Sequence, residues 1–325
     1  MAAAGGAGAP QLLADRADAT VVRVGNRVAK AHSPETVEAA LLVRLRFTCH
    51  PWLRPILAEP HTGATVRRHR DRLITVWPFG DTVDPDDPNA APWAEAATLL
   101  ARLHALPIPP PHRFNCAVRQ LDPLPSAGGP ARVRRAMHRL VAAGDSVDGA
   151  AAAAVRHAHA GLCAELPEIA TAPSELASRR SAATASGEVA APSARRRLVH
   201  GDFHLGQLIR LPDRTGNPWR LVDIDDVGVG DPAWDLSRPA AFYAAGILEP
   251  IAWERFLNAY RIADGPAVPA AGDPWPALDL PARAVVIQAA ALAIVAAGAA
   301  GRPLDDIDKA LVDTCSRISA WPMTS

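Results

Sequence analysis

Short apolar runs separated by turn residues dominate the first 80 positions of the chain. Residues 20–24 and 26–32 are two such runs, rich in β-branched side chains, and the Gly-Asn pair at their junction predicts a β-hairpin. A cap, a proline and an acid at 33–35 predict a helix start, and apolar residues at helical spacing extend this helix to Phe47. Further strands are predicted near 56–58, 64–67 and 73–77.

After an Asp/Pro-rich stretch at 81–88, the apolar spacing becomes helical. A short β segment at 198–222, broken by a turn at 212–218, interrupts the helices, and an Ala/Ser/Arg-rich insertion covers about 173–197. We therefore predict an α+β protein with a β-rich N-terminal lobe (1–80) and a mainly helical C-terminal lobe (81–325). Helices are expected at 93–106, 131–143, 149–166, 232–245, 250–262, 282–300 and 304–321.

Charge and composition exclude several classes of function. The chain has 34 basic and 34 acidic residues, so no bulk field attracts nucleic acid or an anionic membrane. The 4 cysteines form no C-x-x-C pair and are interpreted as reduced core residues. Residues 1–10 lack the pattern of a secretion signal, and the alanine-rich run 284–300, which contains Gln288, is expected to be a buried helix. A cytoplasmic protein is expected, as a monomer or a homodimer.

The strongest chemical signal is the sequence LVHGDFHLGQLI at 198–209. Apolar residues flank a polar loop that holds Asp202 and Gln207 five positions apart. This arrangement suits an aspartate that orients a hydroxyl group and an amide oxygen that binds Mg²⁺. Alternatively, Asp202 caps a turn, and His200 and His204 are packed core residues. For His204 alone the structural interpretation is preferred.

A second motif, LVDIDDVGVGDPAWDL, follows at 221–236. Asp223 ends a predicted strand, where a metal-binding carboxylate belongs, and hard oxygen ligands suit Mg²⁺. Asp225 and Asp226 can instead be a solvated turn, and this interpretation is slightly favoured for Asp226. Asp235 lies at a helix start and is expected to order the 198–209 loop through backbone hydrogen bonds.

The two motifs together resemble the paired signature of aminoglycoside phosphotransferases and of the related choline, homoserine and sugar kinases. The resemblance covers about 21–236, including LARLHALP at 100–107. It implies a two-lobed, protein-kinase-like fold and transfer of the γ-phosphate of ATP or GTP to a hydroxyl group of a small molecule. It also implies that Asp202 is the catalytic residue and that Gln207 and Asp223 hold Mg²⁺. The family usually has Asn where this chain has Gln207; maltokinase-like sugar kinases share the glutamine, which favours a sugar acceptor.

The N-terminal lobe supplies the remaining candidates. Lys30 resembles the kinase lysine that pairs with the nucleotide phosphates, and Glu38 is its expected partner, with Glu35 as the competitor. Val76, Trp77 and Phe79 belong to a segment that resembles the hinge that meets the adenine; a simple strand end is equally compatible. No glycine-rich phosphate loop is found at 13–20.

The acceptor is left open between an aminoglycoside, an amino sugar and a neutral sugar. An acidic rim for an amine-bearing substrate is considered, although ordinary surface charges are the simpler interpretation. The basic runs at 67–70 and 132–139 are interpreted as solvated turns or helix faces. The alternative to an enzyme is a non-catalytic, kinase-like nucleotide-binding protein. The rim would comprise Glu249, Glu254, Asp305, Asp306 and Asp308.

Overall fold

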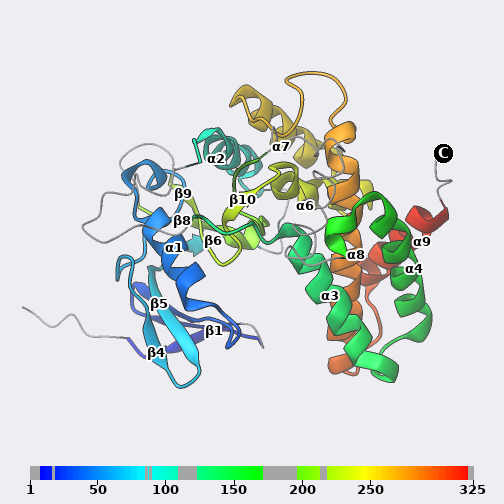
Figure 1. The fold of residues 1–325 in the computed structure, drawn as a ribbon, viewed down its shortest axis with the longest axis horizontal. Helices are drawn as coiled ribbons and strands as arrows, with labels where there is room; N and C mark the ends of the chain where they lie inside the picture. Colours follow the sequence, from blue (N-terminus) through cyan, green and yellow to red (C-terminus); the bar gives the residue numbers. More distant parts are fainter. Residues whose placement is uncertain are drawn as a thin grey trace, which may run out of the picture.

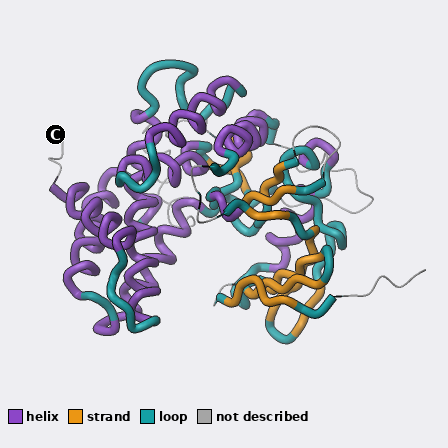
Figure 2. Tube along the Cα trace, turned by 180° about the vertical axis from the view of Figure 1, so that it is seen from behind, coloured by secondary structure: helices purple, strands orange, loops and turns teal. Residues whose placement is uncertain are grey.

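The computed structural model describes residues 8–16, 19–84, 87, 90–108, 123–170, 196–212 and 218–320. The chain forms two lobes, a sheet-rich N-terminal lobe and a larger helical C-terminal lobe (Figure 1). From behind, the strands again gather on one side and most helices on the other (Figure 2). Most of the predicted insertion at 173–197 falls outside the described residues.

The N-terminal lobe is built on an antiparallel five-stranded sheet in the order β1-β2-β3-β5-β4. The predicted hairpin is confirmed, with Gly25 at φ +60° in its turn. Helix α1 (Glu38–Thr48) buries Leu41 and Leu45. In register, Lys30 of β3 lies opposite Thr75 of β5. The strands are β1 (Gln11–Asp15), β2 (Thr20–Val24), β3 (Arg27–Ala31), β4 (Arg67–His69) and β5 (Arg72–Pro78).

Three details of this lobe differ from the sequence-based expectation. Strand β1 was not predicted, because its mostly exposed residues show no alternation of apolar and polar side chains. The helix start at 33–35 is wrong: Thr36 N donates to Ser33 O in a turn, and α1 begins only at Glu38. Residues 56–58 form a single parallel bridge from Leu57 to Leu221 of the other lobe, not a strand of the N-terminal sheet.

Helix α8 (Trp275–Ala299) is the central helix of the C-terminal lobe, packed against α3, α4, α6 and α9. It is long and apolar enough to span a membrane, but 61% of its most apolar window is buried inside the protein. A core helix is therefore the better interpretation, as expected. The other helices are α2 (Trp93–Ala105), α3 (Gly129–Ala143), α4 (Gly149–Glu165), α6 (Ala233–Ala244), α7 (Pro250–Ile262) and α9 (Asp306–Ala320).

Two small sheets form the part of the C-terminal lobe that faces the N-terminal lobe (Figure 1). Strands β7 (Arg197–Val199) and β10 (Gly228–Gly230) pair with each other. A three-stranded sheet has the order β6-β8-β9. Its strands are β6 (Asp81–Thr82), β8 (Leu208–Arg210) and β9 (Trp219–Leu221). The pairing of β7 with β10 and of β8 with β9 brings the two sequence motifs together, and Val222 N donates to Gln207 O at 2.9 Å.

Candidate active site

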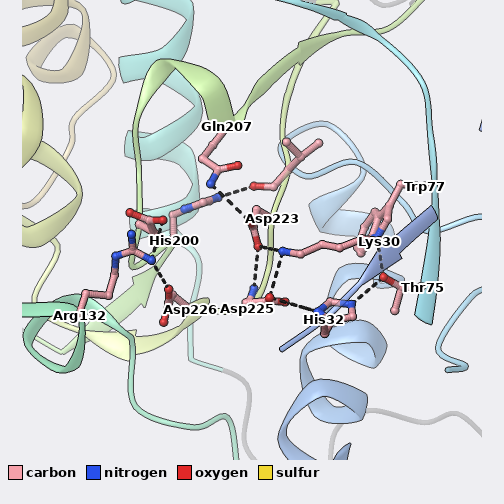
Figure 3. Close-up of polar contacts among 12 residues, drawn as sticks. Lys30, His32, Thr75, Trp77, Arg132, His200, Gln207, Asp223, Asp225 and Asp226 are labelled. Carbon is pink, nitrogen blue, oxygen red and sulfur yellow. Dashed lines mark hydrogen bonds and ion pairs between the residues drawn. The ribbon is translucent and has the colours of Figure 1, made fainter. Parts of the chain in front are cut away.

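Lys30 projects from β3 of the N-terminal lobe onto two carboxylates of the C-terminal lobe (Figure 3). Its Nζ lies 2.6 Å from Asp223 Oδ1 and 2.9 Å from Asp225 Oδ2, and the side chain is 11% exposed. Burial lowers the pKa of Lys30, but Asp223 and Asp225 outweigh burial and hold that pKa above its ordinary value. Burial likewise opposes ionisation of the two carboxyl groups, yet Lys30 keeps both pKa values below the usual range. All three groups are therefore charged at neutral pH.

A buried hydrogen-bonded chain continues from this cluster into the sheet (Figure 3). His32 lies two residues after Lys30, and its Nδ1 is 2.9 Å from Asp225 Oδ1. Its Nε2 is 2.8 Å from Thr75 Oγ1, which also accepts a hydrogen bond from Trp77 Nε1 at 2.8 Å. A neutral His32 satisfies all these contacts if Nδ1 donates to Asp225 and Nε2 accepts from the hydroxyl. The chain fixes Asp225 beside the lysine.

Glu38 does not pair with Lys30, so that prediction is wrong. Because α1 begins at Glu38, this side chain lies in the exposed first turn, where it accepts a hydrogen bond from Arg68 at 2.6 Å. Glu35 does not replace it; its backbone N donates to Ser33 Oγ within the preceding turn. The partners of Lys30 come instead from the second motif.

The predicted hinge at 76–79 is the end of β5. Val76 O accepts from His61 N at 2.8 Å, and Phe79 N donates to Asn26 O at 2.9 Å. Trp77 is buried, with its indole turned toward Thr75, while Arg23 stacks on the ring of Phe79 at 3.4 Å from the centroid. These backbone groups already have protein partners, so contact of this segment with an adenine stays a prediction.

The first motif forms a loop between β7 and β8 that the buried carboxylate of Asp235 holds in place. Asp235 accepts from His200 N at 2.6 Å and from Gly201 N at 2.7 Å, which confirms the expected ordering role. His104 Nε2 supports the same carboxylate at 2.9 Å. Gly201 adopts φ +82°, and a Cβ there would lie 2.2 Å from Asp226 O. Only glycine fits this close contact between the two motifs.

Asp202 supplies the carboxylate of this loop, and two arginines pair with it. Arg132 NH1 lies 2.8 Å from Asp202 Oδ2, and Arg238 NH2 lies 3.7 Å from Asp202 Oδ1. Burial raises the pKa of Asp202 to about 6, and the two guanidinium groups only partly counter this effect. A carboxylate with this pKa is ionised at neutral pH and remains basic enough to accept a proton.

Gln207 and Asp223 are brought together as expected, with Gln207 Nε2 3.4 Å from Asp223 Oδ2 (Figure 3). Asp223 has φ +65°, a conformation that is sparsely populated for residues other than glycine and is common at functional sites. Among the described residues, no group of three His, Cys, Asp or Glu side chains is arranged to hold a metal ion. The donors present are hard oxygens, which suit Mg²⁺ bound mainly by phosphate oxygens, provided that the Gln207 amide turns its oxygen inward.

Arg132 and Arg238 were not predicted as site residues: Arg132 was interpreted as part of a solvated basic run, and Arg238 was not considered. The interpretation of Asp226 was wrong. Asp226 is not a solvated turn residue: its carboxylate lies 2.8 Å from Arg132 and 3.4 Å from Arg135. His204 accepts from Gly206 N at 3.1 Å and caps the 3-10 turn, in line with the structural interpretation. The signal for Arg132 and Arg135 was their spacing of three, which places both on one helix face.

Comparison with known proteins identifies relatives of this arrangement. A model of the phosphotransferase enzyme family matches residues 10–275, whereas no functionally curated protein matches the chain. Choline kinase LicA from Streptococcus pneumoniae aligns with a TM-score of 0.56 at 12% identity, over 96% of this chain and 93% of that one. A choline/ethanolamine kinase family protein from Mesorhizobium loti aligns with a TM-score of 0.50 at 18% identity, over 98% and 89%.

Spectinomycin phosphotransferase APH(9)-Ia, solved with ADP and spectinomycin, aligns with a TM-score of 0.50 at 12% identity, over 95% of this chain and 88% of that one. At these identities the alignments establish the fold. They confirm the predicted two-lobed α+β, kinase-like architecture over nearly the whole chain.

Proposed function

Because the chain belongs to the phosphotransferase enzyme family, we propose that it transfers the γ-phosphate of ATP, or of GTP, to a hydroxyl group of a small molecule with the help of Mg²⁺. The observation that carries this proposal is the 2.6 Å contact between Lys30 of the N-terminal lobe and Asp223 of the C-terminal lobe. It joins a phosphate-binding cation to a metal-binding carboxylate, next to the loop that bears Asp202.

Each side chain has a distinct role in this proposal. Lys30 binds the nucleotide phosphates, and Asp223 and Gln207 would hold Mg²⁺, which supplies further neutralisation of the phosphate charge. Asp202 orients the acceptor hydroxyl and takes its proton. Phosphoryl transfer asks mainly for positioning and charge stabilisation, so these few groups suffice.

The neighbouring kinases support a nucleotide co-substrate without deciding its base. Spectinomycin phosphotransferase was solved with ADP, and an aminoglycoside 2′-phosphotransferase with GDP. Lys30 and Asp223 would contact phosphates, which ATP and GTP share. Direct comparison of the two nucleotides in the same assay decides between them.

The test is release of ADP from ATP by the purified chain, measured with a panel of hydroxyl acceptors. We expect acceptor-dependent, Mg²⁺-dependent release that Asp202→Asn reduces by about 10²-fold or more, because the base is lost while the shape is kept. ATP binding should survive in Asp202→Asn. The matched control is Asp279→Asn on α8, which is 54% exposed and remote from the loop. Nucleotide binding without any turnover would favour the non-catalytic alternative.

A further inference from the structure

The side of the site next to Asp202 is basic. Helix α3 carries arginine at 132, 134, 135 and 139, and no acidic residue occurs along its length. Arg132 and Arg135 both turn toward Asp226, and Arg132 also reaches Asp202. With Arg238, three arginines surround these two aspartates, so the group has a net charge of 3 − 2 = +1 when both carboxylates are ionised.

Arg238 is the least compensated of these cations. It lies on α6, one turn after Asp235, and its side chain is 21% exposed. Its contacts among the described residues are the 3.7 Å ion pair with Asp202 and the ring of Phe242, 5.9 Å from the guanidinium carbon. Neither is a hydrogen bond. A guanidinium carries five N–H donors. Among the described residues, no Arg238 nitrogen is a buried atom without a partner, so its N–H groups reach solvent beside Asp202, where an anion could accept from them.

The neighbouring His204 responds to the same positive field. Burial, together with Arg238 and Arg132, lowers the pKa of His204 to about 3, so the ring is neutral. Because Nδ1 accepts from Gly206 N, the ring proton resides on Nε2, which is a donor. The guanidinium groups of Arg132 and Arg238 are therefore the cations that an anion beside Asp202 would meet.

We propose that the hydroxyl acceptor carries a negative charge, as a carboxylate or a phosphate group, which Arg238 and Arg132 bind. This inference rests on the proposed phosphotransferase function and narrows its acceptor class. It also gives the Arg132–Asp202 ion pair a role. Arg132 shares its NH1 between Asp202 and Asp226, and its Nε is buried without a partner. The anion of the acceptor draws Arg132 away and frees Asp202 Oδ2 for the hydroxyl group.

The transfer step moves one phosphoryl group and one proton. The acceptor oxygen forms a bond to the γ-phosphorus as the bond from that phosphorus to the bridging oxygen breaks, and ADP leaves with the bonding electron pair. The hydroxyl proton passes to the Asp202 carboxylate. The anionic group of the acceptor takes no part in bond making; it fixes the hydroxyl near Asp202.

The acidic rim considered for an amine-bearing acceptor does not form a site. Arg302 pairs with Asp305 and Asp308, and Lys309 pairs with Asp306. Asp306, Asp308 and Lys309 lie in the first turn of α9, and Arg302 and Asp305 just before it. Glu249 instead precedes α7 as its N-cap residue and Glu254 lies on α7, a different helix (Figure 1). Among the described residues, the charged side chains that pair with Asp202 are the arginines Arg132 and Arg238.

The experiment compares acceptors that share one sugar scaffold: glucose, glucosamine, glucuronate and glucose 1-phosphate. With ATP and Mg²⁺ saturating, we expect the two anionic sugars to have a kcat/KM at least about tenfold above those of the neutral and cationic forms. The relative rates of glucuronate and glucose 1-phosphate distinguish carboxylate from phosphate. Arg238→Gln should raise KM for the anionic sugar about tenfold or more and change KM for glucose much less. The inference would be overturned if glucosamine had a higher kcat/KM than the anionic sugars. It would also be overturned if Arg238→Gln raised KM for glucose as much as for the anionic sugar.

A binding measurement removes the dependence on the sugar scaffold. With a non-hydrolysable ATP analogue and Mg²⁺ filling the nucleotide site, millimolar sulfate should raise the Tm of the wild type but not that of Arg238→Gln. Arg255→Gln, at an exposed position of α7, is the matched control and should respond like the wild type. If sulfate raises the Tm of Arg238→Gln and Arg255→Gln equally, or does not raise the Tm of the wild type, the anion site is refuted. Failure of the analogue itself to bind with Mg²⁺ would instead refute the proposed function.

Discussion

Asp202 owes its protonation behaviour to two opposing effects, burial and the charge of Arg132 and Arg238. Burial dominates and raises the pKa to about 6. In the proposed function the ionised carboxylate accepts the hydroxyl proton, so protonation would remove activity. This pKa belongs to the chain without bound acceptor, so we expect kcat/KM for the acceptor to be level well above pH 6 and to fall about tenfold per pH unit well below it.

The measurement is kcat/KM for the acceptor against pH from about 5 to about 8 at saturating nucleotide. Circular dichroism at each pH separates loss of activity from unfolding. Arg132→Gln removes a guanidinium that lowers the pKa of Asp202, so the acid limb should move to higher pH in this variant. A profile that stays flat down to pH 5, or a shift to lower pH, would contradict this account.

Lys30 can be tested by covalent labelling, because the chain contains only two lysines, Lys30 and Lys309. Lys309 is 60% exposed on α9 and serves as an internal control. An acyl-phosphate derivative of ATP transfers its acyl group to a lysine beside the bound phosphates. Mass spectrometry should find the label on Lys30, with excess ATP preventing it, whereas any label on Lys309 should not respond to ATP. ATP-independent labelling of Lys30 would argue against a phosphate contact.

At the scale of single residues, the sequence predicted the central groups and missed their neighbours. Asp202, Gln207 and Asp223 were identifiable because each belongs to a short motif, and Lys30 because it lies on the second strand of the predicted hairpin. Arg132 and Arg238 act through partners in other segments, so only the fold brings them to Asp202. Glu38 was misassigned because the start of α1 was predicted at 33–35, which changes the direction of every side chain in the first turn.

The loop between β7 and β8 joins the two motifs through contact of backbone with backbone. At Gly201 a side chain faces two separate costs, the left-handed φ and the 2.2 Å approach to Asp226 O. Gly246 has a similar φ of +74° but open space where a Cβ would lie. Gly246→Ala should therefore cost about 1 kcal/mol, the conformational part alone.

Gly201→Ala should cost more than Gly246→Ala, roughly 2–4 kcal/mol, because the loop must also shift away from Asp226. The shift displaces Asp202, so activity should fall by more than the loss of folded protein explains. Urea unfolding gives the two free energies, and ADP release at low temperature gives the activity. Equal destabilisation by both variants would mean that the loop accommodates the methyl group without strain.

Elements were predictable where one periodicity dominated. The helices near 93–106, 149–166 and 250–262 were confirmed within a residue or so, since apolar residues at helical spacing face the core. Helix α8 starts at Trp275, seven residues before its predicted position of 282. Pro281 lies inside the helix, which a prediction from sequence disfavours, whereas Pro276 lies in the first turn, where proline is tolerated. Strand β1 is held by pairing with β2 and not by a buried face, so its pattern gave no signal.

At the scale of the whole molecule, the two lobes meet through charged and backbone contacts at the site. Lys30 and His32 reach Asp223 and Asp225, and Arg44 Nε donates to Val227 O at 2.7 Å. A protein of two lobes was predictable from the change of periodicity near residue 80. The ion pairs between the lobes were not predictable, because they depend on how β3 and the second motif are placed relative to each other.

A nucleotide bound at this junction contacts both lobes and so stabilises the folded chain. At 100 times its Kd, ATP with Mg²⁺ should add about 2.7 kcal/mol to the free energy of unfolding and raise Tm by several degrees. Asp223→Asn removes the carboxylate proposed to bind the metal and one of the two partners of Lys30, so the Mg²⁺-dependent part of this rise should vanish. Asp279→Asn should keep the full rise. Thermal shift curves with ATP, recorded with Mg²⁺ and with EDTA, measure the difference. An undiminished Mg²⁺-dependent rise in Asp223→Asn would place the metal, and with it the triphosphate, away from the contact between Lys30 and the second motif.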